Sequence, residues 1–161
     1  REMCLKEKDS KKSIIVTPEM IKDMEEKHWT NSAERIEWVG FGCPHFSFSE
    51  FRELAGLVHG QKFNKDVRTT VFTSRNVYAW VMRLGILDIL NEAGIEVYTD
   101  GCLLRYPQNM NSAGTMMTNS AKAANYIYSQ AGLKAAYGSI KDCVDSAIAG
   151  KVIRRGSAWL G

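Results

Sequence analysis

Strand-like and helix-like segments alternate along most of this chain, and this alternation constrains the fold more than any other feature. The strand-like runs are short and mostly apolar, several of them with β-branched or aromatic residues, and they cover residues 36–42, 69–73, 95–99 and 133–137. Segments with apolar residues at helical spacing cover residues 47–58, 77–84, 86–93, 120–131 and 139–149. Strands separated by helices of this length predict βαβ units. We therefore expect an α/β fold of three layers, in which helices cover both faces of a mainly parallel sheet.

The two ends of the chain differ in composition from this regular middle part. Four lysines crowd into the first dozen residues, at positions 6, 8, 11 and 12. Thr17 followed by Pro18 is typical of a helix start, because Thr can cap a helix and Pro suits its first position. We expect a flexible polar lead-in (1–12), a single α/β domain (13–155) and a tail (156–161). Because the first residue is Arg1 rather than Met, we also expect this chain to be a piece of a longer protein.

Charged residues are numerous but evenly mixed along the chain. The 161 residues include 21 Lys or Arg and 18 Asp or Glu, for a formal net charge of +3. Domains that bind nucleic acid usually carry a basic stripe, which this mixture lacks beyond the lysine-rich start. A membrane span needs about 20 apolar residues in a row, and the sequence has no such run. We therefore expect neither a nucleic-acid partner nor a membrane. No G-x-G-x-x-G follows a strand-like run, which argues against a nucleotide-binding dehydrogenase.

The four cysteines, Cys4, Cys43, Cys102 and Cys143, are widely separated. They include no C-x-x-C pair, and their spacing does not match the disulfide framework of a small secreted domain. A domain of this size can form a sufficient core without disulfides. We therefore expect a reducing, cytoplasmic setting in which the thiols are either buried or bound to metal.

Polar and thiol-bearing residues gather at the junctions between strand-like runs and helices. The junctions are Cys43-Pro44-His45, Thr73-Ser74-Arg75, Asp100-Gly101-Cys102, Thr118-Asn119-Ser120-Ala121-Lys122 and Gly138-Ser139. In an open α/β sheet the strands run out into helices along one edge, and ligands bind there. Helix N-termini at that edge present free N–H groups and partial positive charge, which suit a carboxylate or a phosphate. The sequence therefore predicts a binding site along one edge of the sheet.

Each of these residues also has an ordinary structural explanation. A single cysteine is often a small buried apolar residue, and His45 after a proline can serve a turn. Helix capping alone explains serines at helix starts, namely Ser74, Ser120 and Ser139. Arg75 and Lys122 can be surface cations. Two other classes therefore stay open: a ligand-binding domain with incidental cysteines, and a zinc site formed by Cys43, His45 and Cys102.

The junction motifs occur in an order that resembles one known family. The likeness rests on Gly42-Cys43-Pro44-His45 with Ser47 and Glu50, on Thr73-Ser74-Arg75, on Asp100-Gly101-Cys102, on Met117-Thr118-Asn119-Ser120-Ala121-Lys122, and on Gly138-Ser139 with Cys143. Together they resemble the motifs of the aconitase X family over residues 14–153, nearly the whole chain. The family usually has Asp-Thr-Cys where this chain has Asp-Gly-Cys, so the cysteine is kept while the loop around it differs.

The resemblance implies an aconitase-like domain fold and an iron–sulfur-dependent hydro-lyase, which removes water from a small hydroxylated acid. The family's substrates are cis-3-hydroxy-L-proline and phosphomevalonate. Three cysteine thiolates are expected to hold the cluster, and Cys43 and Cys102 match two of these positions. The third ligand would lie in the amino-terminal half of the enzyme, with Cys143 as a reserve, whereas Cys4 matches nothing.

The resemblance also implies roles for the neighbouring residues. Iron would act as a Lewis acid on the leaving hydroxyl, and His45 would support the cluster ligands or carry a proton. Contacts to the substrate are expected from Ser74, Arg75, Asn119, Ser120 and Lys122. Arg75 and Lys122 would bind its carboxylate or phosphate. A small swivelling domain or subunit is expected to complete the site and supply a catalytic serine, so we expect this chain alone to lack dehydratase activity.

Overall fold

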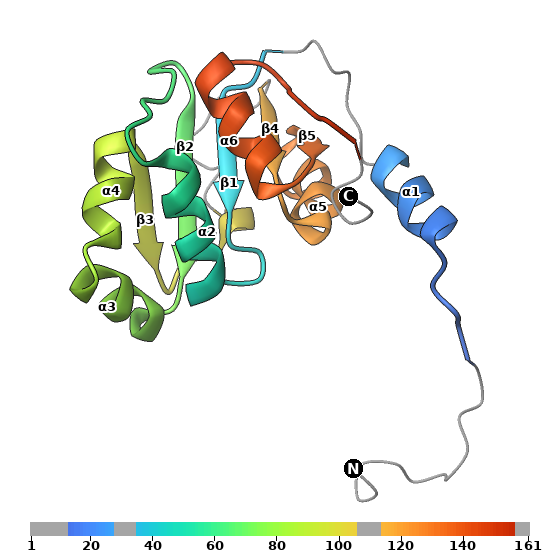
Figure 1. Ribbon diagram of the computed structural model, residues 1–161. Helices are drawn as coiled ribbons and strands as arrows, with labels where there is room; N and C mark the ends of the chain where they lie inside the picture. The colour runs from blue at the N-terminus through green and yellow to red at the C-terminus, as the bar shows by residue number, and fades with distance from the viewer. Residues whose placement is uncertain (1–12, 28–34, 106–113, 157–161) are drawn as a thin grey trace, which may run out of the picture.

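The computed structural model describes residues 13–27, 35–105 and 114–156. Its helices are α1 (Pro18–Lys27), α2 (Phe48–Val58), α3 (Arg75–Arg83), α4 (Ile86–Ala93), α5 (Ala121–Ala131) and α6 (Ile140–Ala149). Its strands are β1 (Trp38–Phe41), β2 (Arg68–Thr73), β3 (Ile95–Thr99), β4 (Thr115–Thr118) and β5 (Lys134–Tyr137) (Figure 1). The expected lead-in and nearly all of the expected tail lie outside the described residues, so these two remain predictions, as does Cys4.

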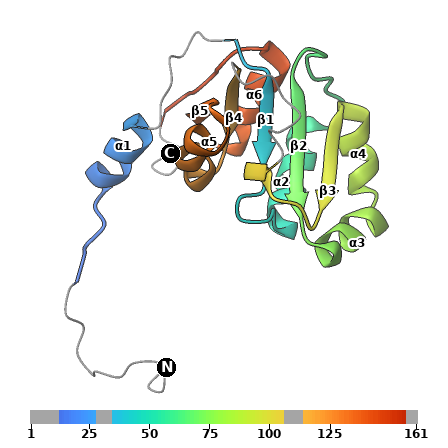
Figure 2. The same cartoon turned by 180° about the vertical axis from the view of Figure 1, so that it is seen from behind.

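The strands form one sheet in the order β3-β2-β1-β4-β5, and all four neighbouring pairs are parallel. Helices α2, α4 and α6 cover one face of this sheet, and α5 covers the other face, as the two opposite views show (Figures 1 and 2). The expected three-layer α/β fold is therefore confirmed.

Each face of the sheet has its own apolar core. The larger core, under α2, α4 and α6, includes Phe41, Leu54, Val71, Leu90 and Val144. The smaller core, under α5, includes Trp38, Phe72, Leu103, Met116 and Ile127. Successive residues of a strand point to opposite faces, and here both faces are covered. For that reason buried residues do not alternate with exposed ones along the central strands: all residues of β1 and β4, and five of the six residues of β2, are buried.

Strand β4 is the element that the sequence did not predict. None of the four strand-like runs in the sequence covers Thr115–Thr118, yet this segment pairs with both β1 and β5. The strand has only four residues, all buried, so it shows no alternation of apolar and polar positions. Two of the four are threonines, which made the segment look polar. The missed strand lies beside β1 in the middle of the sheet.

Two helices bury fewer of their apolar side chains than the helical spacing of these residues suggests. By spacing, Trp80 and Leu84 belong with Val81 on α3, and Tyr128 belongs with Ile127 on α5. Val81 and Ile127 are buried, whereas Trp80 is 61%, Leu84 62% and Tyr128 71% exposed. A helix that lies on a sheet from one side buries only a narrow stripe, and these three side chains lie beside it.

The helix starts follow their capping residues closely. Ser47 and Glu50 form a capping box at the start of α2. Ser74, Ser120 and Ser139 accept hydrogen bonds at the starts of α3, α5 and α6. Each of these three serines therefore caps a helix, as the ordinary structural explanation for a serine at a helix start predicted.

Helix α1 lies outside the three layers (Figures 1 and 2). Glu25 on this helix pairs with Arg154, which follows α6, at 3.2 Å between Oε2 and Nη2. Their side chains are only 1% and 6% exposed, so this is a buried ion pair joining α1 to the segment after α6. Across the described part of the chain, the helices are too short or too polar to cross a bilayer.

Candidate functional site

The strand order creates a switch point between β1 and β4. From β1 the chain moves outward to β2 and β3 on one side, and it later returns to β4 and β5 on the other side. In open α/β sheets, a crevice for ligands forms at such a point, outside the carboxyl ends of the strands. Cys43 follows β1 and Ser120 follows β4, so two predicted junctions meet at this crevice.

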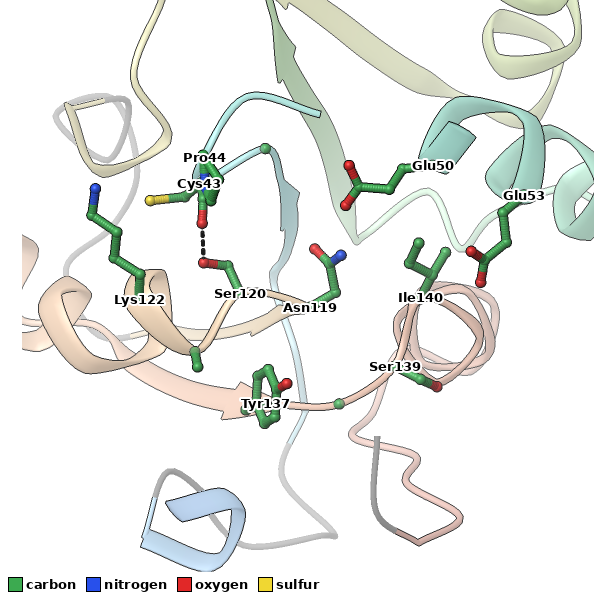
Figure 3. A pocket seen from close by; sticks show the side chains of 13 residues that line it. Cys43, Pro44, Glu50, Glu53, Asn119, Ser120, Lys122, Tyr137, Ser139 and Ile140 are labelled. Carbon is green, nitrogen blue, oxygen red and sulfur yellow. Dashed lines mark hydrogen bonds between the residues drawn. The ribbon is translucent and has the colours of Figure 1, made fainter. Parts of the chain in front are cut away.

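A cavity of about 560 Å³ lies at the switch point (Figure 3). Its lining consists of Gly42, Cys43, Pro44, Glu50, Glu53, Asn119, Ser120, Ala121, Lys122, Tyr137, Gly138, Ser139 and Ile140. Residues from three of the five predicted junctions, namely 43–45, 118–122 and 138–139, therefore line one cavity. Of the substrate contacts expected from the sequence, Asn119, Ser120 and Lys122 line it, whereas Ser74 and Arg75 do not.

The start of α5 is attached directly to the Cys43 loop. The hydroxyl of Ser120 donates a hydrogen bond to the carbonyl oxygen of Cys43 (Figure 3). The same oxygen atom of Ser120 accepts from the backbone N–H of Ala123, at 3.0 Å, and so caps the helix. One side chain thus joins the end of β1 to the start of α5.

The Cys43 loop is also held against the end of β2. Gly42 has φ +96°, and a Cβ at this position would lie 2.1 Å from the carbonyl oxygen of Phe72, so only glycine fits there. Beyond the cis Cys43–Pro44 peptide bond, the N–H of Phe46 donates to the same Phe72 oxygen at 2.8 Å. The hydroxyl of Thr73 in turn donates to the Phe46 oxygen at 2.7 Å. These contacts fix the backbone on both sides of Cys43.

The thiol of Cys43 is largely buried, and its surroundings affect its ionisation in opposite directions. Burial is the main effect and raises its pKa, since a thiolate loses solvation there. The charge of Lys122 and a hydrogen bond from Ser120 lower the pKa, while the charge of Cys102 raises it. Lys122 lines the same cavity as Cys43. A metal that binds Cys43 must displace its proton.

Cys102 lies in a tight turn after β3 and is exposed. Asp100 in this turn has φ +56°, and it is the one residue other than glycine with a positive φ among those that the structure describes. Nε2 of His45 donates to the carbonyl oxygen of Gly101 at 2.9 Å. A carbonyl can only accept, so Nε2 carries the proton in this arrangement. His45 is thus bound to the Cys102 turn.

Ser74 and Arg75 take part in contacts other than the expected ones. Ser74 caps α3 by accepting from the N–H of Val77 at 3.3 Å. The guanidinium of Arg75 pairs with the carboxylate of Asp100, and its side chain is 82% exposed. The structure therefore places both residues outside the cavity at the β1–β4 switch point, with Arg75 attached to the turn that carries Cys102.

Cys143 is separated from the other thiols. It lies on α6, is 0% exposed and belongs to the larger core on the opposite face from Cys43. Burial and the charge of Asp142 raise its pKa well above the ordinary range. Its assignment as a reserve cluster ligand is therefore wrong, because a fully buried thiol in the apolar core is not available at the sheet edge.

The alternative of a zinc site formed by Cys43, His45 and Cys102 is not supported by the geometry. Within the ranges that the structure describes, no three His, Cys, Asp or Glu side chains are grouped as ligands for one ion. The described chain instead offers two thiols at one edge, with the imidazole of His45 engaged by Gly101.

Glu50, Glu53 and Tyr137 line the cavity but were not expected as site residues. The backbone N–H and the hydroxyl of Ser47 both donate to Oε2 of Glu50, so this carboxylate is engaged within the capping box. Glu53 follows one turn later on the same face of α2, in an exposed position. The S-x-x-E pattern of residues 47–50 could have located Glu50 at the helix start, and the i, i+3 spacing could have placed Glu53 beside it.

Comparison with known proteins agrees with this arrangement. Residues 36–149 match the family model of the aconitase X third domain. The cis-3-hydroxy-L-proline dehydratase of Pseudomonas aeruginosa is 34% identical over 152 residues, which is 93% of this chain and 26% of that protein. The phosphomevalonate dehydratase large subunit of Methanosarcina mazei is 30% identical over 133 residues, which is 81% of this chain and 31% of that protein.

A solved structure has the same fold. The holo-form of aconitase X from Thermococcus kodakaraensis superimposes with a TM-score of 0.73 at 23% identity, covering 87% of this chain and 36% of that one. The chain thus spans about a quarter to a third of the length of its relatives. Since the family model covers most of the chain and encloses its cavity residues, the chain belongs to the aconitase X family.

Proposed function

We propose that this chain is the part of an iron–sulfur hydro-lyase that contributes two cluster thiols and one wall of the substrate pocket. The enzyme would remove water from a small hydroxylated acid. The observation that carries this proposal is the joining of two thiol-bearing loops. Cys43 lines the cavity together with Lys122, and His45, two residues after Cys43, is hydrogen-bonded to Gly101, the residue before Cys102. The similarity to two dehydratases supports the reaction class.

The donor set fits a cluster better than a single harder metal ion. Thiolates are the usual ligands of iron–sulfur clusters, and Cys43 and Cys102 would hold it from this chain. A third protein ligand would come from another part of the enzyme. When bound, the cluster would supply a Lewis acid for the leaving hydroxyl. All three cysteines in the described ranges are free thiols, which fits the reducing cytoplasm that we propose as its setting.

The residues of this chain would bind and orient the substrate. Lys122 is positioned for a carboxylate or phosphate, at the start of α5, where the helix dipole adds to its charge. Asn119 offers its side-chain amide to the cavity (Figure 3). Ser120 would act mainly through Cys43, because its hydroxyl is already engaged. Removal of the substrate proton would require a base from a small domain or subunit, in line with the "large subunit" name of one relative.

The charges around the cavity favour an amino acid over a phosphate ester. Figure 3 shows Lys122 at one side of the cavity and the carboxylates of Glu50 and Glu53 at the other side. A zwitterion can place its carboxylate at Lys122 and its ammonium group toward Glu53, whereas a phosphate ester has no cation to offer. We therefore propose cis-3-hydroxy-L-proline in preference to phosphomevalonate.

The experiment that tests this function uses the longer protein that contains this chain, together with its small partner. After anaerobic reconstitution with iron and sulfide, dehydration of both compounds is assayed, and the 161-residue chain alone serves as the inactive control. Turnover of cis-3-hydroxy-L-proline is expected, and Glu53→Gln should raise KM for it more than Arg52→Gln, an exposed neighbour on α2. Absence of turnover with either compound, or turnover by this chain alone, would contradict the proposal.

A further inference from the structure

The turn that carries Cys102 is held on its amino-terminal side by residues of β2 and α3. Asp100 adopts a left-handed backbone conformation, which is costly for most residues but tolerated by Asp and Asn. Its N–H donates to the carbonyl oxygen of Thr73 at 3.1 Å, and its carboxylate pairs with Arg75. Backbone and side chain of Asp100 are thus both attached to the β2–α3 junction.

The next residue of the turn is fixed by two further contacts. The carbonyl oxygen of Gly101 accepts from Nε2 of His45. A Cβ at position 101 would lie 2.9 Å from ring atoms of Phe72, so glycine lets the turn close onto β2. The Asp-Gly-Cys variant of the family motif therefore has a structural reason in this chain.

The carboxyl-terminal side of the turn is anchored in the smaller core. Leu103 is 0% exposed, and a Cβ at Gly40 of β1 would lie 2.7 Å from its Cδ1 atom. Gly40 thus makes room for Leu103. Cys102 stands between this anchor and Asp100, and it is itself exposed. The backbone on both sides of the thiol is fixed while the sulfur stays accessible.

We propose that Arg75, acting through Asp100, is a positioning residue that holds the Cys102 thiol beside Cys43, and that it does not contact the substrate. This inference rests on the proposed function, in which the two thiols bind one metal centre. The pair is exposed, at 82% for Arg75 and 42% for Asp100, so its effect on global stability should be small. Residues that orient metal ligands have a much larger effect on metal affinity.

Cobalt binding distinguishes an effect of the Arg75–Asp100 pair on metal affinity from an effect on global stability. Co²⁺ is titrated into the 161-residue chain carrying Cys4→Ser, and the thiolate-to-cobalt charge-transfer band reports sulfur ligands. The band should appear in this parent and be absent from Cys43→Ser and Cys102→Ser. Arg75→Met and Asp100→Asn should weaken cobalt binding about 10-fold, while Arg75→Lys retains part of it. Arg83→Met removes another exposed cation of α3 and serves as the control.

The melting temperatures of Arg75→Met and Asp100→Asn should match that of Arg83→Met, because only the turn is affected. Asn tolerates the left-handed conformation at position 100, so Asp100→Asn decides the matter if Arg75→Met fails to fold. Cobalt affinity equal to that of Arg83→Met in either folded variant would overturn the inference. A parent without the charge-transfer band would instead show that the thiols do not converge, which would refute the proposed metal site itself.

Discussion

The hydroxyl of Ser120, the residue that caps α5, donates a hydrogen bond to the carbonyl oxygen of Cys43 at the end of the β1 strand. These two residues are 77 positions apart in the chain. The bond crosses the switch point of the sheet, so the proposed cluster ligand and the helix that presents Lys122 are positioned relative to one another. A helix cap thereby becomes part of the site.

Replacing Ser120 should be more destabilising than replacing an ordinary capping serine. Ser120→Ala removes the cap, at a cost of about 1 kcal/mol, and also leaves the Cys43 carbonyl without this partner, at a cost of about 1–3 kcal/mol. Ser74→Ala removes a cap alone and should cost about 1 kcal/mol. Urea unfolding measures the free energy of unfolding of both variants. Equal losses in the two would show that the hydrogen bond from Ser120 to Cys43 contributes nothing to stability.

The glycine before Cys43 should not tolerate a side chain. Gly42→Ala would place a Cβ against the Phe72 carbonyl with φ at +96°, and we expect a loss of about 3 kcal/mol or more. Gly56 on α2 is the matched control, because its added Cβ meets no atom within 4 Å. Gly56→Ala should stabilise the chain by about 0.5–1 kcal/mol. Thermal or urea unfolding of both variants checks the difference, and a mild effect at Gly42 would contradict the observed backbone.

The thiols should react with a disulfide reagent in an order set by their exposure. In a Cys4→Ser chain, exposed Cys102 should react first and mostly buried Cys43 more slowly, since its raised pKa leaves little thiolate. Cys143 should react only after unfolding. Stopped-flow kinetics with mass spectrometry identifies each site. Rapid labelling of Cys143 in the folded chain would contradict its place in the core.

Cys143 should make the chain less stable in alkali. Burial raises the pKa of its thiol in the folded state, so above the ordinary thiol pKa of about 8.5 the unfolded chain loses this proton and the folded chain keeps it. Below pH 8.5 the buried, protonated thiol of Cys143 makes its full contribution to the free energy of unfolding. Above pH 8.5 this contribution to the free energy of unfolding falls by about 1.4 kcal/mol per pH unit, until the pKa of the folded state is reached.

Comparison with Cys143→Ala isolates this effect. At neutral pH the variant should be less stable than the natural chain, because it leaves a cavity. The difference between the two unfolding free energies should then shrink from pH 8.5 toward pH 10. A difference that stays constant over this interval would show that the thiol at position 143 ionises equally in both states.

Sequence patterns located most of the scaffold because its physical causes are local. Capping serines and strand-like runs each act over a few residues, and both were found in the sequence. The β4 strand was missed because four fully buried residues carry no periodicity of their own. Its identity as a strand depends on β1 and β5 on either side, which a local pattern does not contain.

The site was predictable at the level of junctions, but not of contacts. The rule that strand ends share one edge correctly brought Cys43 and Lys122 together at one cavity. For Arg75 the family resemblance implied a contact to the substrate, and its pairing with Asp100 was not foreseen. Its partner Asp100 is 25 residues away, on the far side of α3 and α4 in the sequence. Likewise, only the packing of α6 shows that Cys143 is enclosed in the core, since a buried and a ligating cysteine look identical in sequence.

The most direct measurement is the iron content of the longer protein after anaerobic reconstitution, compared between single Cys→Ser variants. Cys43→Ser and Cys102→Ser are each expected to lose most of the bound iron and the absorption of the cluster, while Cys143→Ser keeps both. Full iron content in the Cys43→Ser or Cys102→Ser protein would contradict the claim that these two thiols hold one centre.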